Sequence, residues 1–188
     1  MNIGIFGGTF NPIHKGHLNL AKEVKRILKL DKVIFVPTYL PPHKSNKGII
    51  PAGHRLKMVR LATHSAAGLS VSDVEIRRRG KSYTIDTLKV MKRKYRLSRL
   101  FFLIGSDSLE YLDGWKDLSE VFELADFVVV NRPGCPRRAL PKGALWLRIK
   151  PLDISSRIIR ELIRQGRPIN KFVDVLVGQY IHKHNLYQ

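Results

Sequence analysis

The sequence predicts an α/β fold with a doubly wound, mostly parallel sheet that is covered by helices on both faces. Short apolar runs recur along the chain, and most are separated by stretches with apolar residues at helical spacing. A glycine pair, Gly7-Gly8, directly follows the first apolar run, where a strand would turn into a helix. A chain of 188 residues is long enough for one such core, so we expect residues 1–188 to form a single domain.

The N-terminal part is expected to form a strand–helix–strand unit followed by a long loop. Asn2–Phe6 is an apolar run, Gly16–Leu30 has the period of an amphipathic helix, and Lys32–Pro37 is the second expected strand. The apolar run of this second strand is continuous, which is typical of strands buried on both faces. The segment Pro37–Pro51 contains four prolines and little periodicity, so we expect a loop there.

The remainder of the chain continues the alternation of strands and helices. The expected helices are Ala52–Ala66, Thr84–Tyr95, Ser155–Gln165 and Lys171–His184. The expected strands are Leu69–Ile76, Leu100–Ile104, a segment within Phe122–Val130, and Leu145–Ile149. This order predicts a Rossmann-like sheet with a helical C-terminal part. Ligands of such sheets bind beyond the carboxyl ends of the strands, so we expect the site in the loops after Phe6, Val36, Ile104 and Val130.

The composition is that of a strongly basic globular protein. The formal net charge is +19, from 34 Lys and Arg against 15 Asp and Glu, and such a charge attracts phosphate-bearing partners. No apolar stretch approaches the roughly 20 residues that span a bilayer. Residues 1–6 also lack the basic region of a signal peptide, so we expect a cytoplasmic protein with no membrane partner. Cys135 is the only cysteine, which excludes an internal disulfide, and we expect no chemical role for it.

The first loop, residues 7–17, reads Gly-Gly-Thr-Phe-Asn-Pro-Ile-His-Lys-Gly-His. Glycines allow close approach of a ligand to the backbone, and the following helix start attracts phosphate. His14 and His17 are three residues apart, so both can donate to the same phosphate. The spacing is not the dinucleotide fingerprint, and Glu75 occupies the place of the first glycine of a P-loop ending at residues 80–82. Zinc binding by the two histidines would need further ligands.

The run from Gly8 to His17 resembles the signature of the nucleotidyltransferase superfamily of adenylyl- and cytidylyltransferases. The resemblance implies that His14 and His17 hold the α-phosphate region of a nucleoside triphosphate. It further implies that the start of the loop binds ATP, through Gly7, Gly8, Thr9 and Phe10.

Ile154–Arg160 resembles the second pattern of the superfamily, Ile-Ser-Ser-Thr-x-Ile-Arg, with Arg157 in place of the usual Thr. Serines at a helix start cap it, and the N–H groups beside them can bind the β- and γ-phosphates. Arg160 follows about one turn later and can make a charge-assisted contact to the same phosphates. The ATP-binding residues expected here are Ser155, Ser156, Ile159 and Arg160. By itself, the pattern also fits an ordinary capped amphipathic helix.

The middle of the chain resembles bacterial nicotinate mononucleotide adenylyltransferases. The matching segments are residues 41–44 (Pro-Pro-His-Lys), 82–84 with 86–88, 105–108, Trp115 and 132–134 (Arg-Pro-Gly), in the family's order. A pyridine ring needs an aromatic surface, which Trp115 can provide, and a carboxylate needs hydrogen-bond donors. The resemblance implies that the acceptor is bound by Lys44, Tyr83, Thr84, Asp107, Trp115 and Arg132. Two alternatives are that Trp115 is a core aromatic and that Asp107 caps a helix. Lys116 stands where the family often has Tyr.

The expected reaction is attack of the acceptor's phosphate oxygen on the α-phosphorus of ATP, with pyrophosphate as the leaving group. Phosphate is already ionised at neutral pH, so catalysis should consist of positioning and charge neutralisation. The catalytic candidates are His14, His17, Lys44 and Arg160. Mg²⁺ is the expected cofactor, held by triphosphate oxygens and water rather than by a metal site of the protein.

Three alternatives to this function differ in what the protein binds. The acceptor could be nicotinamide mononucleotide or phosphopantetheine, although the phosphopantetheine family typically has Thr at the position of His14. The charge of +19 would also suit a nucleic-acid-binding protein, but that function leaves both motifs unexplained, so we expect no specific nucleic-acid partner. The sequence leaves open whether the protein is a homo-oligomer.

Overall fold

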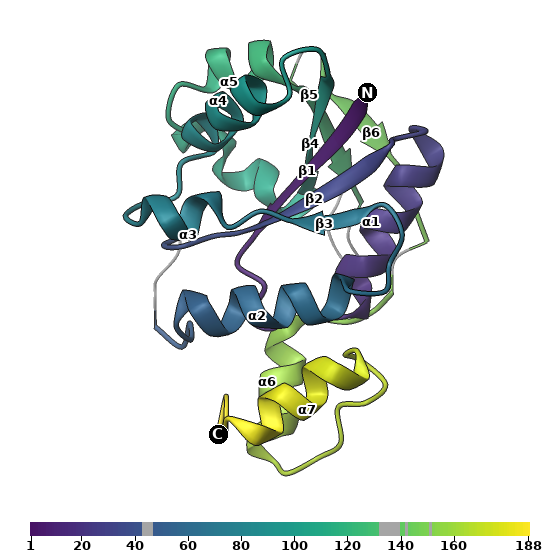
Figure 1. Cartoon of the computed structure of the whole chain (residues 1–188), viewed down its shortest axis with the longest axis vertical. Helices are drawn as coiled ribbons and strands as arrows, with labels where there is room; N and C mark the ends of the chain where they lie inside the picture. The colour runs from purple at the N-terminus through teal and green to yellow at the C-terminus, as the bar shows by residue number, and fades with distance from the viewer. Residues whose placement is uncertain (43–46, 132–139, 142, 151) are drawn as a thin grey trace.

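The computed structural model describes residues 1–42, 47–131, 140–141, 143–150 and 152–188. Within these ranges, one sheet contains the strands β1 (Asn2–Gly8), β2 (Lys32–Pro37), β3 (Leu69–Val71), β4 (Arg99–Gly105), β5 (Asp126–Val130) and β6 (Leu145–Leu147). Their order is β3-β2-β1-β4-β5-β6, and every neighbouring pair is parallel (Figure 1). The predicted α/β fold with a mostly parallel sheet is confirmed.

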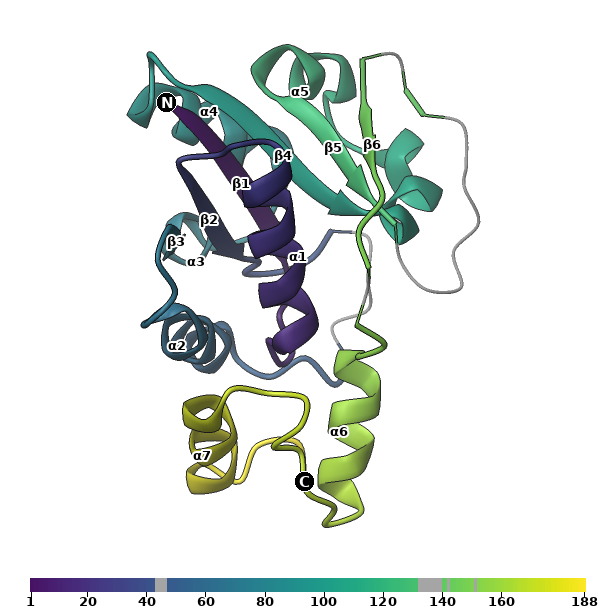
Figure 2. The same ribbon diagram turned by 90° about the vertical axis from the view of Figure 1, so that its right-hand side faces the viewer.

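The helices are α1 (Lys15–Ile27), α2 (Ala52–Thr63), α3 (Val74–Arg78), α4 (Thr84–Lys94), the 3₁₀ helix η1 (Ser106–Gly114), α5 (Leu118–Leu124), α6 (Ser156–Arg164) and α7 (Val175–Lys183). Figure 2 shows α6 and α7 at the bottom of the view, with α7 beneath α2, which confirms the helical C-terminal part. None of the described helices is both long and apolar enough to cross a membrane.

The core lies on both faces of the sheet because successive strand residues point to opposite sides. In β2, Val33 and Phe35 pack with α1 and α2, whereas Ile34 and Val36 pack with α4 and α5. Figure 1 shows these helix pairs on either side of the sheet. Burial on both faces explains why the sequence of β2 is continuously apolar rather than alternating.

The strand order places a crevice at the carboxyl edge of the sheet. β2 pairs with one side of β1, and β4 pairs with the other side. The loops that follow β1 and β4 therefore turn toward opposite faces of the sheet and leave space between them. This is the position where the sequence predicts ligand binding.

The predicted strand Leu69–Ile76 is wrong beyond Val71, because the chain enters α3 at Val74. Val74 and Glu75 are consecutive and both buried. A strand would send these two side chains to opposite faces, whereas a helical turn directs Val74 into the core and leaves Glu75 at the crevice. Tertiary packing therefore overrides the local alternation.

Some helices and helix boundaries also differ from the prediction. Helix α5 begins directly after Asp117, whose φ is 51°, and no helix was expected there. Helix α7 begins at Val175 instead of Lys171, because the side chain of Asp174 accepts the N–H of Leu176 at 2.9 Å and caps the helix.

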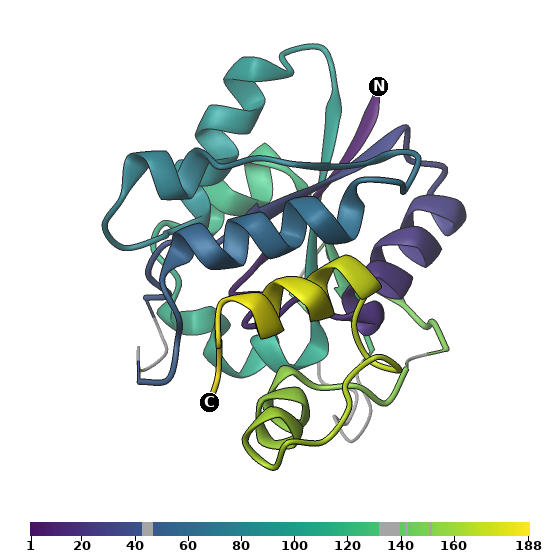
Figure 3. The same ribbon diagram turned by 60° about the horizontal axis from the view of Figure 1, so that its bottom comes forward.

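The C-terminal helix is attached to α2. The hydroxyl of Tyr180 in α7 lies 2.9 Å from Nδ1 of His54 in α2. Figure 3 shows the two helices side by side. This contact holds the C-terminal part of the chain against the helical layer that covers one face of the sheet.

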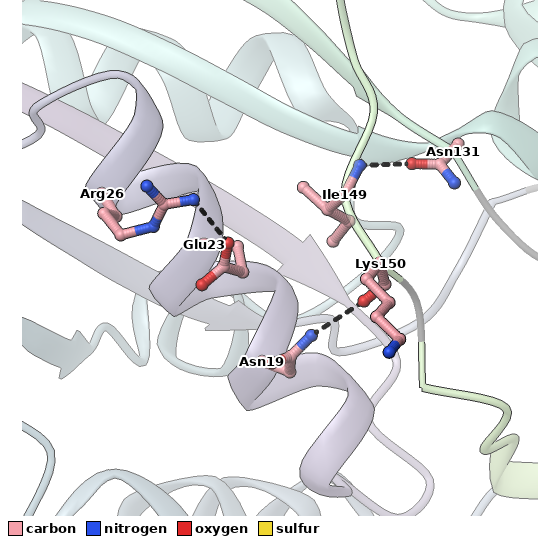
Figure 4. Close-up of polar contacts among 6 residues, drawn as sticks. All are labelled: Asn19, Glu23, Arg26, Asn131, Ile149 and Lys150. Atoms are coloured by element: carbon pink, nitrogen blue, oxygen red, sulfur yellow. Dashed lines mark hydrogen bonds and ion pairs between the residues drawn. The ribbon is translucent and has the colours of Figure 1, made fainter.

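The connection from β6 to α6 is anchored at two points (Figure 4). The Ile149 N–H donates to Oδ1 of Asn131 at 2.7 Å, and Nδ2 of Asn19 in α1 donates to the Lys150 carbonyl at 3.3 Å. The first bond ties the chain to the residue that follows β5, and the second ties it to α1. Helix α6 consequently begins beside the loop after β1, which brings the two sequence motifs together.

Candidate active site

A cavity of about 530 Å³ opens at the carboxyl edge of the sheet. Its walls come from the loops after β1, β2 and β4 and from the first turns of α4 and α6. The predicted site residues that line it are Gly7, Gly8, Thr9, Phe10, His14, His17, Tyr83, Thr84, Asp107, Trp115, Ser155, Ser156 and Arg160. Lys44 and Arg132 lie outside the described residues.

The two histidines of the first loop form a stacked pair. Their ring centroids are 3.7 Å apart, and His14 is the N-cap residue of α1. The backbone N–H of His14 donates to Nδ1 of His17 at 3.2 Å. Because Nδ1 accepts this bond, the proton of neutral His17 is on Nε2, and that atom is a hydrogen-bond donor. The arrangement supports the predicted contact of His17 with a phosphate.

The motif glycines make room for the rings around the histidines. A Cβ atom at Gly8 would lie 2.8 Å from the Phe10 ring, and one at Gly16 would lie 3.0 Å from Nδ1 of His14. Phe10 is buried, and its ring stands edge-on to His17 with centroids 5.1 Å apart. Steric demand inside the loop thus explains these two glycines, in addition to close approach of a ligand.

The second motif is joined directly to the first. Ser155 caps α6 with its side-chain oxygen, which confirms the predicted cap for this serine. The hydroxyl of Ser156 donates to the Pro12 carbonyl at 2.8 Å, and Nη1 of Arg160 donates to the Asn11 carbonyl at 2.7 Å. These pairs are 144 and 149 positions apart in the sequence. The start of α6 and the loop after β1 therefore form one wall of the cavity.

Ile159 and Arg157, two positions apart in α6, have contrasting environments. The side chain of Ile159 is fully buried in the core, and its N–H donates to the Ser155 carbonyl at 3.2 Å. Its side chain anchors the helix and does not line the cavity. Arg157, the departure from the superfamily pattern, does line the cavity and adds a positive charge there.

Sequence reasoning missed Arg55, which organises the loops around the cavity. Its side chain is 1% exposed, and it donates to the carbonyls of Thr9 (2.7 Å), Tyr39 (3.0 Å) and Ile50 (3.1 Å). These bonds connect the loop after β1 to both ends of the loop after β2. An arginine in an amphipathic helix is normally solvent-exposed, so the sequence carries no local signal for this role.

Aromatic side chains form the wall near η1. Trp115 stands edge-on to Phe102 and Phe127, with centroids 6.0 and 5.8 Å apart, and it also lines the cavity. It therefore packs on the core while presenting part of its surface to the cavity. Tyr83, the N-cap residue of α4, lies nearby, and the ammonium of Lys116 is 5.3 Å from its ring centroid.

Glu75 is a buried acidic residue at the cavity and was also missed as a site residue. It is 5% exposed, and its Oε1 accepts the hydroxyl of Thr87 at 2.7 Å. Burial raises the pKa of Glu75, although hydrogen bonds from Ser82 and Thr87 and the charge of Arg78 oppose this shift. Ser82 also accepts the N–H of Tyr39 at 2.9 Å, which links this cluster to the loop after β2.

Glu75→Gln should become more stable relative to the unmodified protein as the pH rises from about 4 to about 8. A raised pKa means that the folded state holds the proton of Glu75 more tightly than the unfolded state does. The protonated Glu75 carboxyl group therefore contributes fully to stability below the pKa of an unfolded glutamate, and this contribution is lost as the pH rises through the folded-state pKa. Urea unfolding of both proteins across this range measures the difference. Glu123→Gln, at an exposed residue of α5, is the control. A difference for Glu75→Gln that does not change with pH would contradict this account.

The cavity offers no ready-made metal site in the described part of the chain. No group of three or more His, Cys, Asp or Glu side chains lies together there. The carboxylates that line the cavity among these residues are Glu75 and Asp107, against the cationic side chains of Lys47, Lys116, Arg157 and Arg160. This balance favours an anionic ligand over a bare cation.

Comparison with known proteins agrees with this fold. A family model described as cytidylyltransferase-like matches residues 5–162. Plasmodium falciparum nicotinic acid mononucleotide adenylyltransferase, in a structure complexed with NaAD, has the same fold, with a TM-score of 0.81 and 22% identity. That match covers 99% of this chain and 97% of the other. The parallel sheet, the two joined motifs and the family model together define a nucleotidyltransferase.

Curated relatives narrow this class further. Nicotinate-nucleotide adenylyltransferase of Bacillus subtilis is 39% identical over 186 residues, which is 99% of this chain and 98% of the relative. A Shouchella clausii protein named "Probable nicotinate-nucleotide adenylyltransferase" is 42% identical over 98% of this chain and 96% of its own length. The chain belongs to the nicotinate-nucleotide adenylyltransferase family, as the sequence motifs predict.

Proposed function

We propose that this protein transfers the adenylyl group of ATP to nicotinate mononucleotide and forms nicotinate adenine dinucleotide and pyrophosphate, a step of NAD biosynthesis. One observation carries the proposal: a single cavity has the two sequence motifs, joined by hydrogen bonds, on one wall and an aromatic wall near η1. Full-length relatives that are named for this activity support it. The acceptor phosphate attacks the α-phosphorus in line, the bond to the bridging oxygen breaks, and pyrophosphate leaves.

The loop after β1 and the start of α6 are proposed to bind the triphosphate. His14 and His17 donate hydrogen bonds near the α-phosphate, where negative charge develops during transfer. Arg160, fixed by its bond to the Asn11 carbonyl, contacts the β- and γ-phosphates together with the N–H groups beside Ser155. One backbone N–H of the first turn of α1 already has a partner within the protein, because the N–H of Lys15 donates to the carbonyl of Phe172.

The wall near η1 is proposed to bind the acceptor. Trp115 offers a surface for stacking of the pyridine ring, and the first turn of α4, from Thr84, offers N–H donors to its carboxylate. Tyr83 and Asp107 line the same cavity, and Asp107 is proposed to contact a ribose hydroxyl. The roles of Lys44 in acceptor binding and catalysis, and of Arg132 in acceptor binding, rest on the sequence motifs alone.

Mg²⁺ is proposed to enter with ATP as part of the substrate. The cavity has few carboxylates and several cationic side chains, which fits a metal bound mainly by phosphate oxygens and water. When bound, the ion would neutralise triphosphate charge. The cationic side chains and histidine donors of this chain would neutralise the rest.

We further propose that residues 1–188 form one domain. One hydrophobic cluster runs from Phe6 in β1 through Phe35 in β2 to Val177 in α7, so the C-terminal helices share a core with the sheet. The cytoplasmic location remains a prediction from the sequence.

Pyrophosphate release by the purified protein with ATP and Mg²⁺ tests the function. Nicotinate mononucleotide, nicotinamide mononucleotide and phosphopantetheine are compared at equal concentration, and the nicotinate compound should react fastest. Faster release with another acceptor would support the nucleotidyltransferase activity but would show that nicotinate mononucleotide is not the preferred acceptor. Absence of release with all three would refute the proposal and favour the nucleic-acid alternative. In that event, nucleic-acid binding should be measured up to roughly 200 mM salt, where purely electrostatic binding weakens strongly.

A further inference from the structure

We infer that Lys116 is a specificity-determining residue that favours an acceptor with a carboxylate over the corresponding amide. This inference rests on the proposed function, because it concerns the acceptor of that reaction. Lys116 directly follows Trp115 at the end of η1, lines the cavity, and holds its ammonium 5.3 Å from the centroid of the Tyr83 ring. The cation–π contact keeps the charge at the aromatic wall.

The chemical difference between the two acceptors is one unit of negative charge. Nicotinate carries a carboxylate and nicotinamide carries an amide, and both present an oxygen that accepts hydrogen bonds. Backbone N–H groups at the start of α4 can therefore bind either compound. A positive charge at the same place attracts the carboxylate much more strongly than the neutral amide.

Lys116 is placed differently from the other described cationic side chains of the cavity. Arg157 and Arg160 belong to α6, on the wall proposed for the triphosphate. Lys47 precedes Gly48, whose carbonyl accepts a bond from Asn11 in the loop after β1, so it lies in a segment bonded to the donor side. Among the described cationic residues that line the cavity, Lys116 is thus the one next to the aromatic side chains of Trp115 and Tyr83.

The two acidic residues of the cavity would act against a carboxylate ligand in their vicinity. Glu75 and Asp107 line the same cavity and would repel a second negative charge. Burial raises the pKa of Glu75, which lessens its repulsion. The ammonium of Lys116 opposes this repulsion and favours the acid over the amide.

The test compares kcat/KM for nicotinate mononucleotide with that for nicotinamide mononucleotide in four proteins. Lys116→Met removes the charge and retains the chain length, whereas Lys116→Arg retains the charge. Lys94→Met is the matched control, because Lys94 has the same charge and a similar contact, 5.6 Å from the Tyr95 ring, away from the cavity. Lys94→Met removes one positive charge, as Lys116→Met does, so it also shows how much the net charge alone affects kcat/KM. The fourth protein is unmodified.

Lys116→Met should reduce the preference for the nicotinate compound about 10-fold, through a higher KM for that compound, with little change for nicotinamide mononucleotide or ATP. Lys116→Arg should retain most of the preference, and Lys94→Met should retain all of it. An equal loss with both acceptors, or an unchanged ratio in Lys116→Met, would overturn the inference.

Failure of the proposed function remains distinguishable from failure of this inference. The rate of the unmodified protein with nicotinate mononucleotide tests the function alone. If that protein shows no turnover, calorimetric binding of the two mononucleotides to it and to Lys116→Met tests the preference directly. An equal affinity ratio in both proteins would then contradict the role of Lys116.

Discussion

Replacement of His17 by alanine should lower kcat for adenylyl transfer about 10²- to 10³-fold. In neutral His17 the proton is on Nε2 because Nδ1 accepts the His14 backbone N–H, so the ring is oriented as a donor before substrate arrives. A fixed donor stabilises charge that develops at the α-phosphate and needs no reorganisation during the reaction. Steady-state pyrophosphate release with saturating ATP and nicotinate mononucleotide measures the effect.

Two controls separate catalysis from folding in this experiment. His64→Ala changes an exposed histidine at the end of α2 and should leave kcat unchanged. Thermal unfolding of His17→Ala is required because the ring of His17 also packs on Phe10 and Phe6. A folded His17→Ala protein with kcat within about threefold of the unmodified enzyme would remove His17 from the proposed catalytic residues.

Replacement of Arg55 by methionine should lower the free energy of unfolding by about 3–5 kcal/mol. The guanidinium of Arg55 donates to three carbonyl oxygens of the two loops, and methionine fills similar space but leaves these oxygens without their donor. Because Thr9 lies in the ATP-binding loop, the variant should also raise the KM for ATP. Urea unfolding, with the KM measured well below the transition, tests both effects.

The geometry of Arg55 makes a lysine replacement a useful companion. A lysine retains the charge but cannot reproduce the fork that reaches three separate carbonyls, so Arg55→Lys should recover only part of the stability. Lys57→Met, at an exposed position on the same helix, controls for loss of a positive charge. A loss of less than about 1 kcal/mol in Arg55→Met would mean that water satisfies the freed carbonyls.

The sequence was most informative where one local rule sufficed. The continuous apolar run of Lys32–Pro37 predicted β2 with its observed bounds, because a strand buried on both faces has no polar position. The serines before α6 predicted its cap, since a capping oxygen acts within three residues of its own position. The sequence failed at Val74–Arg78, where burial of two consecutive side chains decided the conformation.

By itself, the sequence determined the α/β fold, the family and the two motifs that we propose bind phosphate, because each depends on the local order and spacing of residues. Only the tertiary structure decided how the motifs meet, through bonds from Ser156 and Arg160 to a loop more than 140 positions away. It also decided that Glu75 is buried at the cavity and Arg55 against the loops beside it, whereas local pattern would place both on the surface. The physical reason is that burial and hydrogen-bond partners arise from packing between distant segments, which no local period encodes.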